Sequence, residues 1–153
     1  MGPERYNDLY EKFKNLNRLL AWGHARVIEG LLAQRPDCPR ALSDQFAKEH
    51  VLERALGPRA KSSGMKLDQR TKGESDIAVA AASILARERF IDWMREASVR
   101  LGVTLPRGAG LVKSVASEIV AQRGVDFLSK IAKMHFKTTR EVLGLPPLAD
   151  AEE

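Results

Sequence analysis

Two acidic residues, Asp44 and Glu74, follow short segments that favour strand structure, and their carboxylates could ligate a metal ion. Asp44 ends the segment 40–44, and Glu74 comes soon after the segment 65–70. Acids at the ends of neighbouring strands can converge on one point, and Mg²⁺ and Mn²⁺ prefer oxygen ligands. Two such metals about 3.5–4 Å apart would activate a water and stabilise the leaving oxygen in phosphodiester cleavage. From spacing alone, surface acids or N-caps are the commoner explanation, and Glu74 or Asp76 could cap the next helix.

The charge of the chain favours a polyanionic partner. The formal net charge is +5 and the isoelectric point is about 9.6. Net charge by itself predicts only non-specific attraction, but the segment 59–72 concentrates it. Lys72 could neutralise a phosphate beside Glu74, and a solvated surface lysine is the equal alternative. The basic residues of this segment are Arg59, Lys61, Lys66, Arg70 and Lys72, against one acid, Asp68.

The composition is typical of one soluble globular domain. The chain has 153 residues, of which 44% are hydrophobic and 29% charged, which excludes a disordered chain. Cys38 is the only cysteine, so an internal disulfide and a cysteine-based zinc site are excluded. No apolar run could cross a bilayer and no secretory signal is visible, so we expect a cytoplasmic protein.

The elements that must position these acids are mostly helices. In the helix that ends near Leu32, an apolar stripe predicts the buried face. That stripe is Leu16, Leu20, Gly23, Val27 and Leu31, flanked by Leu19, Ile28 and Leu32. The predicted helices are 6–13, 15–32, 45–56, 76–100, 108–122 and 125–133, with a break at Gly124, a loop at 57–64 and a final turn at 138–143.

Two short strands do not make an independently stable sheet, and amphipathic helices need a broad surface to cover. The alanines of 76–100 would let that helix lie close to a sheet. We therefore predict the helix-rich end of an α/β domain with few strands, and a helical bundle is the alternative. His24 is expected to pack or hydrogen-bond in the core rather than act in catalysis, and His50 to lie on an exposed helix face.

Several sequence blocks, taken together, resemble the ribonuclease HIII branch of the type 2 ribonucleases H. They follow the family order from about Tyr6 to Gly144, and Phe136 stands where the sister ribonucleases HII carry tyrosine. The blocks are Tyr6-Asn7-Asp8-Leu9-Tyr10 with Asn15-Leu16-Asn17, Leu20-Ala21-Trp22-Gly23-His24-Ala25, Asp44-Gln45-Phe46-Ala47, Lys72-Gly73-Glu74-Ser75 leading into 78–87, and His135-Phe136-Lys137-Thr138-Thr139.

The resemblance implies a partial RNase H-like fold and hydrolysis of the RNA strand of RNA–DNA hybrids, with Mg²⁺ or Mn²⁺ held by four carboxylates. It places the third carboxylate at Asp44 and the fourth at Glu74. Asp76 is the fallback, because the spacing from Glu74 to Ser83 is one residue shorter than the family pattern. It also implies nucleic-acid contacts from Arg70, Lys72, Lys137, Thr138 and Thr139, although either threonine could instead cap the last turn.

The sequence departs from the family in one respect. The family's first two acids form an Asp-Glu pair in a Gly-rich loop, and this sequence contains no Asp-Glu dipeptide. The resemblance therefore assigns residues 1–148 to the C-terminal half of a catalytic domain, followed by an acidic tail, 149–153, with the N-terminal half missing. We expect a monomer when complete and little or no activity from this chain alone. The competing interpretations are a non-catalytic helical nucleic-acid-binding module and a truncated fragment.

Overall fold

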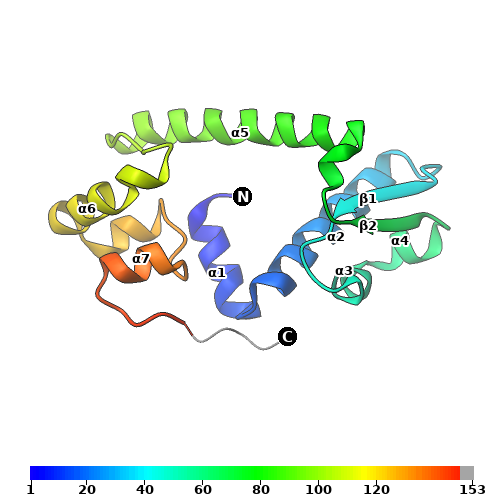
Figure 1. Ribbon diagram of the computed structural model, residues 1–153, viewed down its shortest axis with the longest axis horizontal. Helices are drawn as coiled ribbons and strands as arrows, with labels where there is room; N and C mark the ends of the chain where they lie inside the picture. The colour runs from blue at the N-terminus through cyan, green and yellow to red at the C-terminus, as the bar shows by residue number, and fades with distance from the viewer. Residues whose placement is uncertain (149–153) are drawn as a thin grey trace. The chain divides into compact units, whose positions relative to one another are not determined.

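The computed structural model describes residues 1–148, so the predicted acidic tail lies outside the described residues. The fold is α/β and helix-rich, as predicted, with a small parallel sheet of two strands in the described part (Figure 1). The elements in chain order are α1 (Pro3–Phe13), α2 (Leu16–Gln34), β1 (Arg40–Asp44), α3 (Glu49–Ala55), α4 (Pro58–Ser62), β2 (Lys66–Arg70), the 3₁₀ turn η1 (Gly73–Ser75), α5 (Ile77–Leu101), α6 (Ala109–Ser129) and α7 (Lys137–Val142).

Strands β1 and β2 run in the same direction, so their carboxyl ends lie at one edge of the sheet. The register pairs Arg40 with Lys66 at one end and Asp44 with Arg70 at the other. The amide of Gln45 donates to the carbonyl of Arg70 at 2.9 Å, which continues the pairing beyond Asp44. The backbone at this edge is therefore held on both sides of Asp44.

The residues from Asn15 to Ile91 form one compact unit, which contains the sheet. Helices α2, α3 and α4 pack together beside the two strands (Figure 1). Leu52 of α3 is fully buried against Ala21 and Ala25 of α2. Small alanines let the two helices approach closely and leave Leu52 to fill the space between them.

A second unit comprises Met1–Lys14 and the described residues from Asp92 onward. Its α1 is joined to the end of α6 through Asn7. The Asn7 amide donates to the carbonyls of Ser129 and Ala132, both at 3.0 Å, and its Oδ1 accepts from the amide of Met134. These bonds satisfy carbonyl groups that the end of a helix leaves without intrahelical partners.

Two local predictions were wrong. The predicted helix 45–56 begins only at Glu49, because Gln45 still pairs with β2 and Phe46 turns into the core against His24. The predicted loop 57–64 contains α4, whose proline lies in the first helical turn. Proline is tolerated there because a backbone N–H at that position would have no acceptor within the helix. The break predicted at Gly124 is confirmed, since this residue has φ 81° between two helical segments of α6.

The buried face of α2 also differs from the prediction. Val27 and Leu31, from the predicted stripe, are 61% and 59% exposed, whereas Leu19 and Leu32 are buried. The alanine-rich start of α5 is exposed as well, from 81 to 90. Within the described residues no sheet covers this part of α5, so the predicted packing of its alanines on a sheet stays a prediction. Among residues 1–148, no helix combines the length and apolar character needed to cross a bilayer.

Candidate metal centre at the carboxyl edge of the sheet

The structure brings Asp44 and the segment that carries Glu74 together at the carboxyl edge of the sheet. Asp44 ends β1, and its Oδ1 accepts a hydrogen bond from the amide of Gly73 at 2.9 Å. Lys72 adopts the left-handed conformation, φ 57°, which turns the chain into η1 against β1. The side chains of Asp44 and Glu74 are both exposed, so each retains carboxylate oxygens for an ion from solvent.

Asp76, the fallback for the fourth carboxylate, serves a different purpose. Its Oδ1 accepts from the amide of Ala78 at 2.9 Å, and its carbonyl accepts from the amide of Ala80, which makes it the N-cap of α5. Its other oxygen lies 3.8 Å from the Arg40 guanidinium. The Asp76 carboxylate is therefore already in contact with a cap amide and a cation, whereas Glu74 is exposed.

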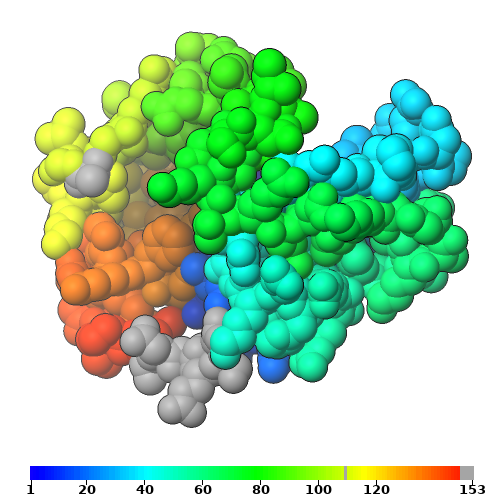
Figure 2. Space-filling view, turned by 45° about the vertical axis from the view of Figure 1, so that its right-hand side comes forward, coloured from blue at the N-terminus to red at the C-terminus, as the bar shows by residue number. Residues whose placement is uncertain are grey.

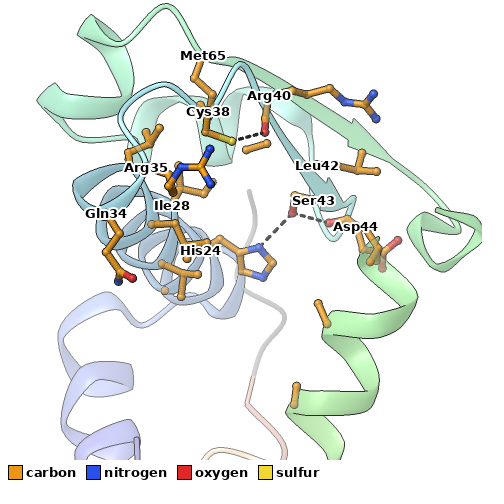
Figure 3. A pocket seen from close by; sticks show the side chains of 18 of the residues that line it. His24, Ile28, Gln34, Arg35, Cys38, Arg40, Leu42, Ser43, Asp44 and Met65 are labelled. Atoms are coloured by element: carbon orange, nitrogen blue, oxygen red, sulfur yellow. Dashed lines mark hydrogen bonds between the residues drawn. The ribbon is translucent and has the colours of Figure 1, made fainter. Parts of the chain in front are cut away.

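A chain of contacts leads from α2 to the backbone of Asp44 (Figure 3). The Nδ1 atom of His24 lies 3.1 Å from the hydroxyl of Ser43, and that hydroxyl donates to the carbonyl of Asp44 at 3.0 Å. Ser43 is only 6% exposed, and the ring of His24 packs against Phe46 with a centroid distance of 4.8 Å. This confirms the expectation that His24 hydrogen-bonds and packs.

The surroundings of His24 favour its neutral form. Burial lowers the pKa of His24 below the ordinary value of 6.5, and the negative charge of Asp44 opposes that shift to a smaller extent. The imidazole is therefore neutral at pH 7, with one nitrogen as donor and the other as acceptor.

An apolar groove of about 730 Å³ adjoins this edge. Its walls come from α2, from β1 and from the start of α5, and Asp44 lies among its lining residues (Figure 3). The cyan segment leading into β1 and the green start of α5 are exposed on one face of the molecule (Figure 2). Apolar side chains that line it include Val27, Leu31, Leu42, Met65 and Val79.

The described residues do not by themselves group a full set of metal ligands. Among residues 1–148, no three histidine, cysteine, aspartate or glutamate side chains are grouped so as to hold an ion. Asp44 and Glu74 suit Mg²⁺ or Mn²⁺ by donor type, and an ion of this kind takes its other ligands from water, phosphate or further carboxylates. Arg70 lies opposite Asp44 in the strand register, and Arg70 and Lys72 are both exposed at this edge.

The other predicted contact residues belong to the second unit. Lys137 begins α7 with its side chain 82% exposed and 4.0 Å from Glu141, so it is accessible to a phosphate. Thr138 is partly exposed, but Thr139 is buried, with 8% exposure. Neither threonine is the N-cap of α7, which is Phe136. A direct contact between Thr139 and nucleic acid would therefore require α7 to move.

Sequence reasoning missed Gly73 and Ser43, which hold Asp44 in place. A Cβ atom added to Gly73 would lie 3.2 Å from both Cα and Oδ1 of Asp44. We expect Gly73→Ala to displace the carboxylate and to weaken Mn²⁺ binding about tenfold, the effect typical of losing a partner that orients a ligand. Mn²⁺ binding can be followed by water-proton relaxation.

Gly30→Ala is the matched control for this substitution, because an added Cβ there meets nothing within 4 Å in the interior of α2. Equal Mn²⁺ affinity for the two variants would contradict the role assigned to the close approach of Gly73 and Asp44.

The amino-acid sequence matches a family model and several known proteins. The family model described as ribonuclease HII matches residues 4–139. Ribonuclease HIII from Chlamydia pneumoniae is 47% identical over 142 residues, which are 92% of this chain and 47% of that protein. Ribonuclease HIII from Protochlamydia amoebophila is 43% identical over 145 residues, covering 94% and 47% of the two chains. The chain spans about half the length of the curated relatives it matches.

A solved structure also matches most of this chain and about half of its own length. The crystal structure of Bst-RNase HIII in complex with Mn²⁺ matches with a TM-score of 0.79 and 29% sequence identity. The match covers 94% of this chain and 48% of that chain.

Proposed function

Because this chain belongs to the ribonuclease HII family, we propose that it forms part of an enzyme that hydrolyses the RNA strand of RNA–DNA hybrids. The observation that carries the proposal is the pairing of Asp44 with the Gly73 amide, which holds Glu74 beside the same sheet edge. The similarity to ribonucleases HIII, one of them solved with Mn²⁺, supports a divalent metal, Mg²⁺ or Mn²⁺, as cofactor.

In this proposal Asp44 and Glu74 are the metal ligands of this chain. Metal bound there supplies an activated water and neutralises charge on the scissile phosphate. The Gly73 amide fixes one oxygen of Asp44, which leaves its remaining lone pairs directed to solvent. Arg70 and Lys72 hold neighbouring phosphates, and contacts to the 2′-hydroxyl distinguish RNA from DNA.

The proposal extends to the predictions that concern the whole enzyme. Residues 1–148 form the C-terminal part of a catalytic domain, and the two further carboxylates come from polypeptide outside this sequence. The complete enzyme is a cytoplasmic monomer. Lys137 and Thr138, both accessible at the start of α7, contact the nucleic acid from the second unit.

The isolated 153-residue chain is expected to show very weak or no cleavage of an RNA–DNA hybrid, because two carboxylates cannot alone hold a pair of metals. The measurement is gel analysis of a 5′-labelled hybrid incubated with Mg²⁺ or Mn²⁺. Metal-dependent cleavage by the purified chain that disappears in Asp44→Asn would contradict this expectation.

The proposed function is tested with a chimaera. In Chlamydia pneumoniae ribonuclease HIII, the 142 matched residues are replaced by the corresponding part of this chain. The chimaera should cleave the RNA strand of the hybrid only with divalent metal, and Asp44→Asn and Glu74→Gln should each slow cleavage strongly. A folded chimaera that binds hybrid in EDTA, does not cleave it, and is unaffected by Asp44→Ala would show instead a non-catalytic binding module.

A further inference from the structure

His24 lies outside the set of carboxylates but is connected to Asp44 by two successive contacts. It extends from α2 toward the end of β1, where its Nδ1 meets the hydroxyl of Ser43, which in turn contacts the carbonyl of Asp44 (Figure 3). Ser43 is 6% exposed, so water competes little for its hydroxyl. A buried hydroxyl strongly favours having both a donor and an acceptor as partners.

The proton count fixes the roles of these groups. A serine hydroxyl carries one proton, and donating it to the Asp44 carbonyl leaves only lone pairs to face His24. Both contacts are satisfied together when Nδ1 of His24 carries a proton and donates it to Ser43. The neutral imidazole is compatible with this arrangement, with Nε2 left as the acceptor.

These contacts add to the restraints on Asp44. Its carboxylate is fixed by the Gly73 amide, and the next residue, Gln45, is held by the carbonyl of Arg70. The Ser43 hydroxyl contacts a further polar group of Asp44, its carbonyl. The packing of the His24 ring against Phe46 limits the rotation of the ring. His24 therefore links α2, through Ser43, to the backbone of Asp44.

We propose that His24 is a positioning residue for the metal centre, acting through Ser43 to orient the Asp44 carboxylate. The inference rests on the proposed function in that it assigns Asp44 to a metal centre. It goes further by naming the residues that set the direction of this ligand. A ligand held within a few tenths of an ångström binds metal more tightly than one that must be ordered on binding.

The substitutions separate hydrogen bonding from packing. His24→Phe keeps an aromatic ring against Phe46 and removes the donor, whereas His24→Asn keeps an N–H donor near the position of Nδ1. Ser43→Ala removes the intermediate hydroxyl. His50→Phe, on the exposed face of α3 in the same unit, is the matched control. Thermal melting of each variant identifies any that fail to fold.

Two readouts by nuclear magnetic resonance on the 153-residue chain test the inference. The first is the chemical shift of the Gly73 amide proton, which reports its hydrogen bond to Asp44. We expect it to move in His24→Phe and Ser43→Ala toward its position in Asp44→Ala, and to stay in place in His24→Asn and His50→Phe. The second is Mn²⁺ titration, followed by paramagnetic broadening of the Gly73 and Glu74 amides.

We expect His24→Phe and Ser43→Ala each to weaken Mn²⁺ binding about tenfold. The double variant should lose no more than either single one, because both remove the same connection. His24→Asn should restore most of the affinity. An unchanged Gly73 amide in both single variants would overturn the inference. So would an effect of His24→Phe that Ser43→Ala lacks, or one that His50→Phe shares.

The two proposals fail in different ways. If the wild-type chain shows no broadening near Gly73 with Mn²⁺, and the chimaera does not cleave, the metal role of Asp44 is wrong. The shift of the Gly73 amide still decides whether His24 orients Asp44, because that readout needs no metal.

Discussion

Replacing Asp44 with asparagine is expected to slow metal-dependent hydrolysis by the chimaeric enzyme ~10³-fold, because a lost metal ligand removes several kcal/mol of transition-state stabilisation. Asparagine keeps an oxygen that can accept from the Gly73 amide, so the sheet edge should remain folded. The loss is therefore one of charge and metal ligation rather than of structure. Single-turnover cleavage of a labelled hybrid measures it.

Asp37→Asn is the matched control for Asp44→Asn. Asp37 has a side chain that is 69% exposed and pairs with Arg35 before β1, so its substitution should leave the cleavage rate unchanged. Comparing Glu74→Gln with Asp76→Asn then tests the assignment of the fourth carboxylate. If Asp76→Asn abolished cleavage in a folded chimaera and Glu74→Gln did not, Asp76 would be the ligand and the preference for Glu74 would be wrong.

The largest expected effect on stability comes from Leu52→Ala. Leu52 is fully buried between α2 and α3, and its nearest buried neighbours are alanines. Alanine has no rotamer with which to fill the vacated space, so the cavity should persist. We expect the free energy of unfolding of the unit 15–91 to fall by about 2–5 kcal/mol, as for other buried leucines.

The two tryptophans allow this loss to be measured in each unit. Trp22 lies in the unit that contains Leu52, and Trp93 lies in the other. Urea unfolding followed by fluorescence, in variants that keep one tryptophan each, should show the change only through Trp22. Leu85→Ala is the control, because its side chain is 72% exposed, and it should alter stability by less than about 0.5 kcal/mol. Equal losses from both variants would contradict the core assignment.

The sequence predicted the two strands almost to the residue, because each combines a favourable local pattern with clear boundaries. It also predicted that Asp44 would end a strand, which is a local property. The contacts of Asp44 with Gly73 and of His24 with Ser43 could not be predicted, since they join residues 29 and 19 positions apart. Such pairs follow from packing, which residue types do not specify.

The face of α2 that is buried shows the same limit. Periodicity identifies the apolar positions of a helix. When a helix has apolar residues on two faces, periodicity does not show which face packs against the rest of the chain. The structure covers the side with Ala21 and Ala25 and leaves Val27 and Leu31 along the groove. The short helix α4 was missed for a different reason, because the glycines, proline and serines of the segment 57–64 are typical of loops.

A molecule that binds the apolar groove of the folded chain would stabilise the fold by an amount that depends on the concentration of that molecule. Val27, Leu31 and the start of α5 expose apolar surface to water, which is unfavourable. A molecule bound in the groove would remove that surface from water. By mass action, an occupant at a hundred times its dissociation constant raises the free energy of unfolding by about 2.7 kcal/mol. An occupant of the groove would therefore raise the melting temperature of the unit 15–91 as its concentration increased.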